Sequence, residues 1–198
     1  MKSIFSRPAF ILAALGATSG IVGTAGLDFG YGRAPQPGLY MVLAGLWFGV
    51  VIGSGVWKFG SRSYIAVATA VTGCWIGWEL TVNLAMHISD VWLKPTVHSD
   101  TARLFIAGFA AGAVGAFVTW AGAAAFTRKL RRVQLATIVT LTGALFGLLL
   151  PLSTYFDHPV VLLAPWQFAV AGILGFGLDV RQNPNPSSLS IDGAIASN

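Results

Sequence analysis

The stretch CWIGWELTVNLAMHISD, residues 74–90, decides the fold class, because an apolar run gives way within it to polar and charged side chains. The run begins near residue 64 and exceeds the roughly 20 helical residues that cross a hydrocarbon layer of about 30 Å. Glu79 and Asn83 fall inside it, where hydrocarbon disfavours polar groups. The stretch therefore predicts a membrane-spanning helix that carries a polar face.

Composition extends this interpretation to the whole chain. Of the 198 residues, 55% are hydrophobic and 10% are charged, and the mean hydropathy is +0.72. In an ordinary soluble domain about a quarter of the residues are charged. The apolar runs are rich in Gly and Ala and apolar on every side, whereas the strands of a membrane barrel would alternate in polarity. We therefore expect an all-α, multi-pass membrane helix bundle.

Six apolar runs are each long enough to span a membrane. They lie near residues 8–27, 39–57, 64–88, 103–126, 133–152 and 160–180. Short connections make sequential helices neighbours, so we expect one six-helix transmembrane domain over residues 1–181. The polar residues 182–198 are expected to form a disordered cytoplasmic tail. A signal peptide cleaved near residues 23–25 is an alternative for the first run, but its length favours a retained helix.

The distribution of positive charge predicts the orientation. Nine of the 12 Lys and Arg residues fall before the first run or after an even-numbered one. The positive-inside rule then places both termini in the cytoplasm, across a bacterial-type inner membrane. Because the charges follow membrane side and not one surface, we exclude a nucleic-acid partner. The basic cluster at residues 128–132 is interpreted as a topology anchor, with docking to anionic lipid or an acidic partner as the alternative.

Glycines spaced four residues apart predict close helix packing in five of the six runs. They are Gly16 and Gly20, Gly45 with Gly49 and Gly53, Gly73 and Gly77, Gly108 and Gly112, and Gly143 and Gly147. At this spacing two glycines lie on one helix face and let backbones approach closely in lipid. The expected partners are therefore the lipid bilayer and, through the same Gly-rich faces, another membrane protein.

The polar residues of the third run share one helix face. Trp75, Glu79, Asn83, His87 and Asp90 fall within a sector of about 120°. A carboxylate at membrane depth costs about 2.5–3.5 kcal/mol on insertion scales, so Glu79 should face the bundle interior or a wet cavity. We expect this face to begin in the outer half of the membrane. Two interpretations stay open: a hydrogen-bonded polar core that joins helices, or a cavity that binds a proton, a cation or a small solute.

The sixth run adds two candidate residues. Pro165 frees a backbone carbonyl one turn earlier, and Trp166 and Gln167 follow at about the depth of Glu79. A broken turn of this kind is typical of small-solute sites, although an interfacial Trp beside a tolerated Pro explains it equally well. The predicted binding residues are Glu79, Asn83, His87, Asp90, Trp75, Trp166 and Gln167.

The sequence predicts no catalytic residue and no metal site, and it does not identify a cofactor. His87, His98 and His158 lack a compact helix-face spacing. Cys74 is the only cysteine, so thiol redox chemistry is not expected. No nucleophile–base spacing or phosphate-binding loop occurs. An enzyme that acts at the outer surface through Asp and His is therefore the weakest of three hypotheses.

The preferred hypothesis is binding or transport of a small solute through an outward-opening polar cavity. In size, span count and position of that cavity, the chain is similar to the substrate-binding subunits of energy-coupling-factor vitamin transporters. This resemblance covers the architecture of the whole chain and implies a role in solute capture. The alternative is a non-catalytic assembly or accessory subunit of a larger membrane complex. The Gly-rich faces and the small number of polar residues favour this alternative.

Overall fold

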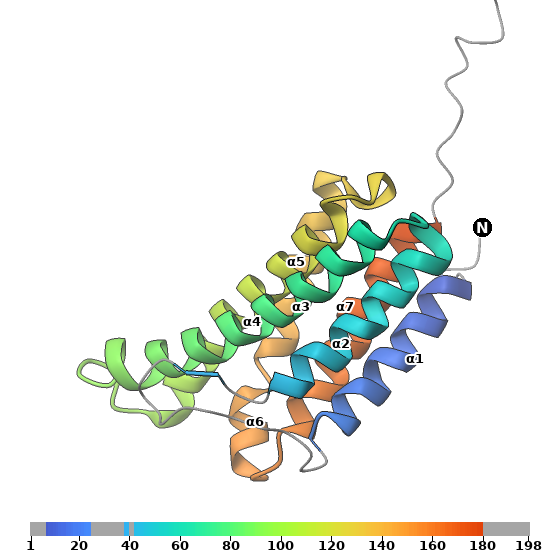
Figure 1. Cartoon of the computed structure of the whole chain (residues 1–198). Coiled ribbons are helices and arrows are strands. Elements are labelled where there is room, and N and C mark those ends of the chain that lie inside the picture. The colour runs from blue at the N-terminus through green and yellow to red at the C-terminus, as the bar shows by residue number, and fades with distance from the viewer. Residues whose placement is uncertain (1–6, 25–37, 40–41, 180–198) are drawn as a thin grey trace, which may run out of the picture.

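The computed structural model describes residues 7–24, 38–39 and 42–179, and over these residues the chain forms a bundle of helices (Figure 1). In chain order the elements are α1 (Arg7–Val22), α2 (Val42–Gly55), η1 (Val56–Gly60), α3 (Tyr64–His87), η2 (Ile88–Trp92), α4 (Asp100–Ala124), η3 (Arg128–Leu130), α5 (Val133–Gly147), α6 (Leu150–Tyr155) and α7 (Val160–Asp179). The π-helical turns η1 and η2 continue α2 and α3. The predicted all-α bundle is confirmed.

Five helical runs are long and apolar enough to cross a membrane. They are Val42–Gly60, Tyr64–Trp92, Asp100–Ala124, Val133–Tyr155 and Val160–Asp179. The first predicted span is too long, because α1 has 16 residues and ends at Val22. At 1.5 Å per residue it measures about 24 Å, less than the hydrocarbon thickness. The last bonds of α1 run from the Gly23 N–H to Ser19 O (2.8 Å) and from the Thr24 N–H to Ile21 O (3.2 Å), so the helix closes in a tightened final turn. The predicted tail lies outside the described residues.

The fifth predicted span, residues 133–152, is broken in the structure. Helix α5 ends at Gly147 and α6 begins at Leu150, with Pro151 in the first turn of α6. A proline inside a helix has no N–H to donate and its ring clashes with the carbonyl four residues earlier, here that of Gly147. At the break, the N–H groups of Leu148 and Leu149 bond to carbonyl oxygens three residues earlier, and Leu150 of α6 lines a pocket described below.

The glycine pairs bring helix backbones into contact, as predicted. A Cβ added at Gly73 on α3 would lie 2.6 Å from the Cα of Gly122 on α4, and one at Gly16 on α1 would lie 2.5 Å from the Gln167 carbonyl oxygen on α7. Gly108 on α4 and Gly147 on α5 face each other's backbone oxygens. All five groups of glycines thus pack against other helices of the same chain, which leaves less of the expected surface for another membrane protein.

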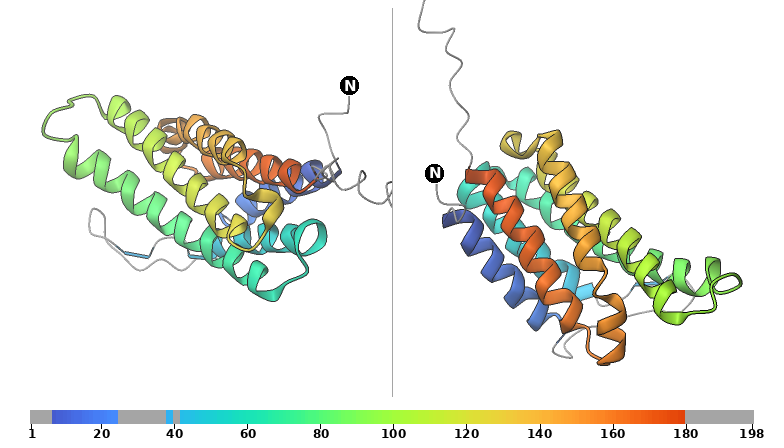
Figure 2. Two further views of the ribbon diagram at one scale, coloured as in Figure 1. Left: turned by 90° about the horizontal axis from the view of Figure 1, so that it is seen from above. Right: turned by 180° about the vertical axis from the view of Figure 1, so that it is seen from behind.

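The start of α1 and the end of α7 lie side by side, although they come from opposite ends of the sequence (Figures 1 and 2). A Cβ at Gly175 would lie 2.7 Å from the carbonyl oxygen of Pro8. At the same end of α7, the Lys129 ammonium donates hydrogen bonds to the carbonyl oxygens of Phe59 (2.9 Å) and Leu178 (3.1 Å). The start of α1, the turn η1 and Lys129 therefore lie at one end of the bundle.

Candidate functional site

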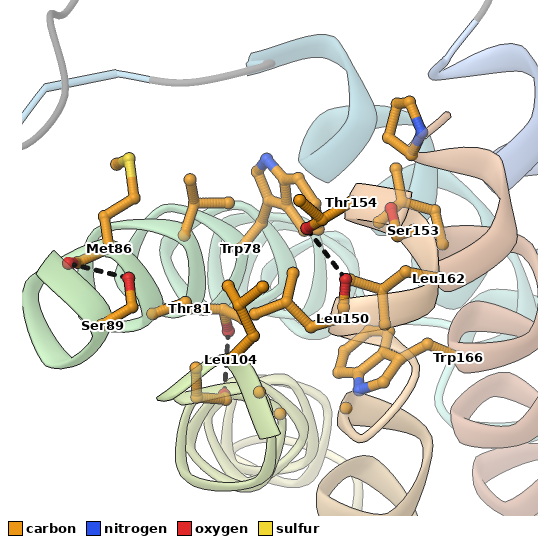
Figure 3. Close-up of a pocket in the computed structure, with 18 of the residues that line it drawn as sticks. Trp78, Thr81, Met86, Ser89, Leu104, Leu150, Ser153, Thr154, Leu162 and Trp166 are labelled. Carbon is orange, nitrogen blue, oxygen red and sulfur yellow. Dashed lines mark hydrogen bonds between the residues drawn. The ribbon is translucent and has the colours of Figure 1, made fainter. Parts of the chain in front are cut away.

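A pocket of about 340 Å³ lies between α3, α4, α5, α6 and α7 (Figure 3). Its α3 wall runs from Trp78 to Asp90, which corresponds to about 18 Å along a helix. Asp90, Thr154 and Pro159 line it and are exposed, so the pocket opens at the end of the bundle where α7 begins. We call this space the apical pocket.

The apical pocket exists because small residues and a helix break meet at one place. Gly108, Gly112 and Gly147 line its wall where α4 and α5 touch, and none of them carries a side chain that could fill the space. On the far side, α6 and the first turns of α7 supply Leu150 and Leu162. The small residues where α4 contacts α5 thus leave the space that forms the apical pocket.

Five side chains that line this pocket donate hydrogen bonds to backbone carbonyl oxygens of the protein. The bonds are Thr81 Oγ1 to Gly77 O (2.6 Å), Ser89 Oγ to Met86 O (3.3 Å), Ser153 Oγ to His158 O (3.2 Å), Thr154 Oγ1 to Leu150 O (3.0 Å) and Trp166 Nε1 to Gly143 O (3.1 Å). Figure 3 shows hydroxyl groups turned toward neighbouring backbone. The apical pocket therefore presents a mostly apolar surface.

A second pocket, of about 460 Å³, lies on another side of α3. It is lined by Gly38, Leu39, Trp75, Ile76, Glu79, Leu80 and Asn83. It is the more open of the two, because Ile76 and Leu80 are 44% and 46% exposed. We call it the lateral pocket. The volume of the lateral pocket is larger because one side is open. The apical pocket is therefore the better enclosed of the two.

Asn83 acts in the lateral pocket as a clamp on the backbone. Its Nδ2 donates to the carbonyl oxygens of Gly38 (2.8 Å) and Glu79 (2.8 Å), and its Oδ1 accepts from the Gly38 N–H (2.9 Å). Both amide hydrogens are thus used. This arrangement fits a polar group that ties the segment before α2 to α3, which is one of the two interpretations left open by the sequence.

The structure does not bring the seven predicted binding residues into one cavity. Trp75, Glu79 and Asn83 line the lateral pocket, whereas Asp90 and Trp166 line the apical pocket. The remaining two line neither: the His87 ring packs edge-on against Trp92 with centroids 5.0 Å apart, and Gln167 is fully buried.

The physical reason is that the polar sector of α3 crosses a boundary between two neighbours. Residues 38–39 cover one side of it, and α4 to α7 cover the other. Glu79 lies one residue beyond the middle of the Tyr64–Trp92 run, on the side of Trp92.

Sequence reasoning missed most of the apical pocket, because its lining is apolar. Val82 and Ala85 are apolar residues of a membrane-spanning run, and the spacing of Gly108 and Gly112 predicts packing and not a binding site. The only available signal was the cluster of small residues on the fourth run. That cluster predicts close packing as readily as a hollow.

Gln167 leads to a prediction about stability. It is 0% exposed, and both its amide oxygen and nitrogen lack a hydrogen-bond partner among the described residues. An unsatisfied buried polar group costs about 1–3 kcal/mol, whereas an apolar group of similar shape avoids that cost. We expect Gln167→Met to raise the free energy of unfolding by about 1 kcal/mol, measured by SDS titration in mixed micelles.

The matched control for this substitution is Gln134→Met on α5, where the side chain is exposed. Its effect should stay within about 0.5 kcal/mol. A fall in stability on Gln167→Met, with the control unchanged, would contradict the expectation and would indicate that the amide is satisfied in the folded protein.

The fold and the pockets define an all-α, multi-pass membrane protein, with five helical runs able to span the bilayer. Within the described residues there is no group of three or more His, Cys, Asp and Glu residues that could hold a metal ion. The chain matches no family model, no curated protein and no solved structure.

Proposed function

We propose that this membrane protein binds a small, largely apolar molecule in the apical pocket. The observation that carries the proposal is a space of about 340 Å³ whose hydroxyl groups already donate to the protein's own backbone. Ligand pockets begin at about 300 Å³ and are mainly apolar with a few polar groups. A polar solute would lose its hydrogen bonds to water on entering this pocket, whereas an apolar molecule loses none.

The orientation supports access from outside the cell. Helix α7 begins beside the exposed rim residue Pro159 and ends at Asp179, next to Leu178, whose carbonyl accepts from Lys129. The rim and the basic end are therefore at opposite ends of a helix about 30 Å long. If the basic end faces the cytoplasm of an inner membrane, as the positive-inside rule implies, the pocket opens outward.

Exposed aromatic residues support the same placement of the bilayer. Trp57 and Tyr64 lie with ring centroids 5.0 Å apart near the basic end. Trp92 and Tyr155, at the rim end, are 59% and 82% exposed. Aromatic side chains favour both membrane interfaces, so these pairs are consistent with a chain that crosses from one interface to the other.

This proposal changes the chemistry expected from the sequence while keeping a small-molecule role. The outward-opening cavity is apolar in its walls, and Glu79 lines the lateral pocket instead. Transport of the bound molecule is a further step that the same pocket could serve. An assembly role through glycine faces has less support, because those faces pack inside the chain.

The test is native mass spectrometry of the protein purified gently from its own membranes. Ala85 lines the apical pocket, so Ala85→Phe should place a ring in the ligand volume. Thr72→Phe is the control, because Thr72 is exposed on the same helix and lines neither pocket. We expect a small-molecule adduct on the wild type and on Thr72→Phe and its loss from Ala85→Phe. An adduct retained by Ala85→Phe would contradict the proposal.

A further inference from the structure

Among the described residues that line the apical pocket, Asp90 is the only charged one. It lies in η2 at the exposed rim, and within the described part of the chain no hydrogen bond or ion pair reaches its side chain. The nearby pair on α4 does not compete for it, because Arg103 binds Asp100 on its own helix. A carboxylate therefore stands at the entrance of an apolar space.

The hydroxyl groups of the pocket point to the same ligand chemistry. Because Thr81, Ser89, Ser153 and Thr154 donate their hydrogens to backbone carbonyls, what they offer a ligand is oxygen lone pairs. A ligand that enters the pocket therefore meets hydrogen-bond acceptors at these four positions.

The start of α7 is also closed to an anion. A helix N-terminus usually offers free N–H groups to negative charge. Here the N–H groups of Val161, Leu162 and Leu163 are bonded to the carbonyl oxygens of His158 and Pro159. Beside Asp90, an anionic ligand would meet negative charge, and these three N–H groups offer it no compensating hydrogen bond.

We propose that the ligand of the apical pocket is an amphipathic amine, with an apolar body between α3 and α7 and one protonated nitrogen at Asp90. This inference rests on the proposed function and adds the charge of the ligand to it. An ammonium group donates several hydrogen bonds and bears the charge that Asp90 attracts. The apolar body fills the space lined by Val82, Ala85 and Leu162.

The experiment compares three probes that share one hydrocarbon cage: adamantylamine, adamantanol and adamantane carboxylate. Full-length protein is reconstituted in phosphatidylcholine nanodiscs, and binding is measured by calorimetry at neutral pH, with empty nanodiscs to subtract partition into lipid. Wild type is compared with Asp90→Asn, Ala85→Phe and Asp157→Asn. The last removes an exposed carboxylate that lines neither pocket and so controls for net charge.

We expect adamantylamine to bind the wild type about tenfold more tightly than adamantanol, with the carboxylate weakest. Asp90→Asn should remove the advantage of the amine and leave adamantanol binding unchanged, while Asp157→Asn should preserve that advantage. Ala85→Phe should weaken binding of every probe that binds.

Two results separate the inference from the proposed function. If adamantanol binds and is lost in Ala85→Phe, but the amine has no advantage or keeps it in Asp90→Asn, the apolar site stands and the amine inference is overturned. If none of the three probes binds the wild type, both fail.

Discussion

Replacing Gly108 with alanine should lower the free energy of unfolding by about 3 kcal/mol, at the upper end of the usual cost of overpacking. A Cβ at this position would overlap the carbonyl oxygen of Gly147 and would lie 2.9 Å from the Cβ of Leu150. The main obstacle is backbone, which cannot rotate away as a side chain can. Helices α4 and α5 would have to separate. SDS titration in mixed micelles measures the loss.

The matched control is Gly172→Ala in the interior of α7. A Cβ at Gly172 would lie 3.2 Å from the Cβ of Ala13 and 3.9 Å from the carbonyl oxygen of Ala9. Small adjustments accommodate it, and alanine favours a helix over glycine by about 1 kcal/mol. Gly172→Ala should therefore be close to neutral. Equal effects at the two positions would show that the α4–α5 contact is not close-packed in the membrane.

The glycine that faces Gly108 sharpens this test. Gly147→Ala should cost a similar amount, because its Cβ would overlap the Gly108 carbonyl oxygen. One separation of α4 from α5 would accommodate both methyl groups. The double variant should thus lose clearly less than the sum of the two single losses, as expected for residues that share a contact.

The second large effect is expected at Lys129, where substitution by methionine should cost about 2 kcal/mol of unfolding free energy. The Lys129 ammonium donates to Phe59 O at 2.9 Å and to Leu178 O at 3.1 Å, at the ends of η1 and α7. Carbonyls at helix ends lack partners within the helix, and a cation there also interacts favourably with the helix dipole. Methionine fills similar space without donors, so both carbonyls lose a charge-assisted bond.

Arg128→Met is the control for this prediction. Arg128 is exposed and precedes Lys129 in the same turn, so both substitutions remove one positive charge from the same loop. Their influence on membrane orientation should therefore be equal, while only Lys129→Met should lower stability in thermal unfolding of purified protein. A loss of similar size in both variants would assign the effect to net charge and not to the two hydrogen bonds.

These contacts refine the interpretation of the basic cluster. The positive-inside rule accounts for four positive charges in one loop. That this loop faces the cytoplasm remains a prediction. The structure adds that Lys129 joins η1 to α7 and that Arg131 Nε donates to Ala124 O at 3.0 Å, near the end of α4. No spacing in the sequence predicts the two bonds of Lys129, because their acceptors are backbone atoms from segments 70 and 49 residues away.

The helices themselves were predictable, because each depends on local chemistry. The third and sixth runs start at the expected residues, Tyr64 and Val160, since an apolar composition and helix-compatible residues suffice in lipid. The errors occur at helix ends. Helix α1 closes after Val22, and Pro151 opens a new helix after α5; a hydropathy average over a long window conceals both.

The sequence by itself determined that this chain is an all-α membrane bundle, where its main helices lie and which glycines allow close contact. It also predicted that Glu79, Asn83 and Asp90 share one sector of the third run, which forms α3 and η2. Only the tertiary structure decided what covers that sector, with residues 38–39 at one edge and α4 to α7 at the other. Helical periodicity sets the direction in which a side chain leaves its own axis, but the neighbour that it meets depends on contacts between distant segments.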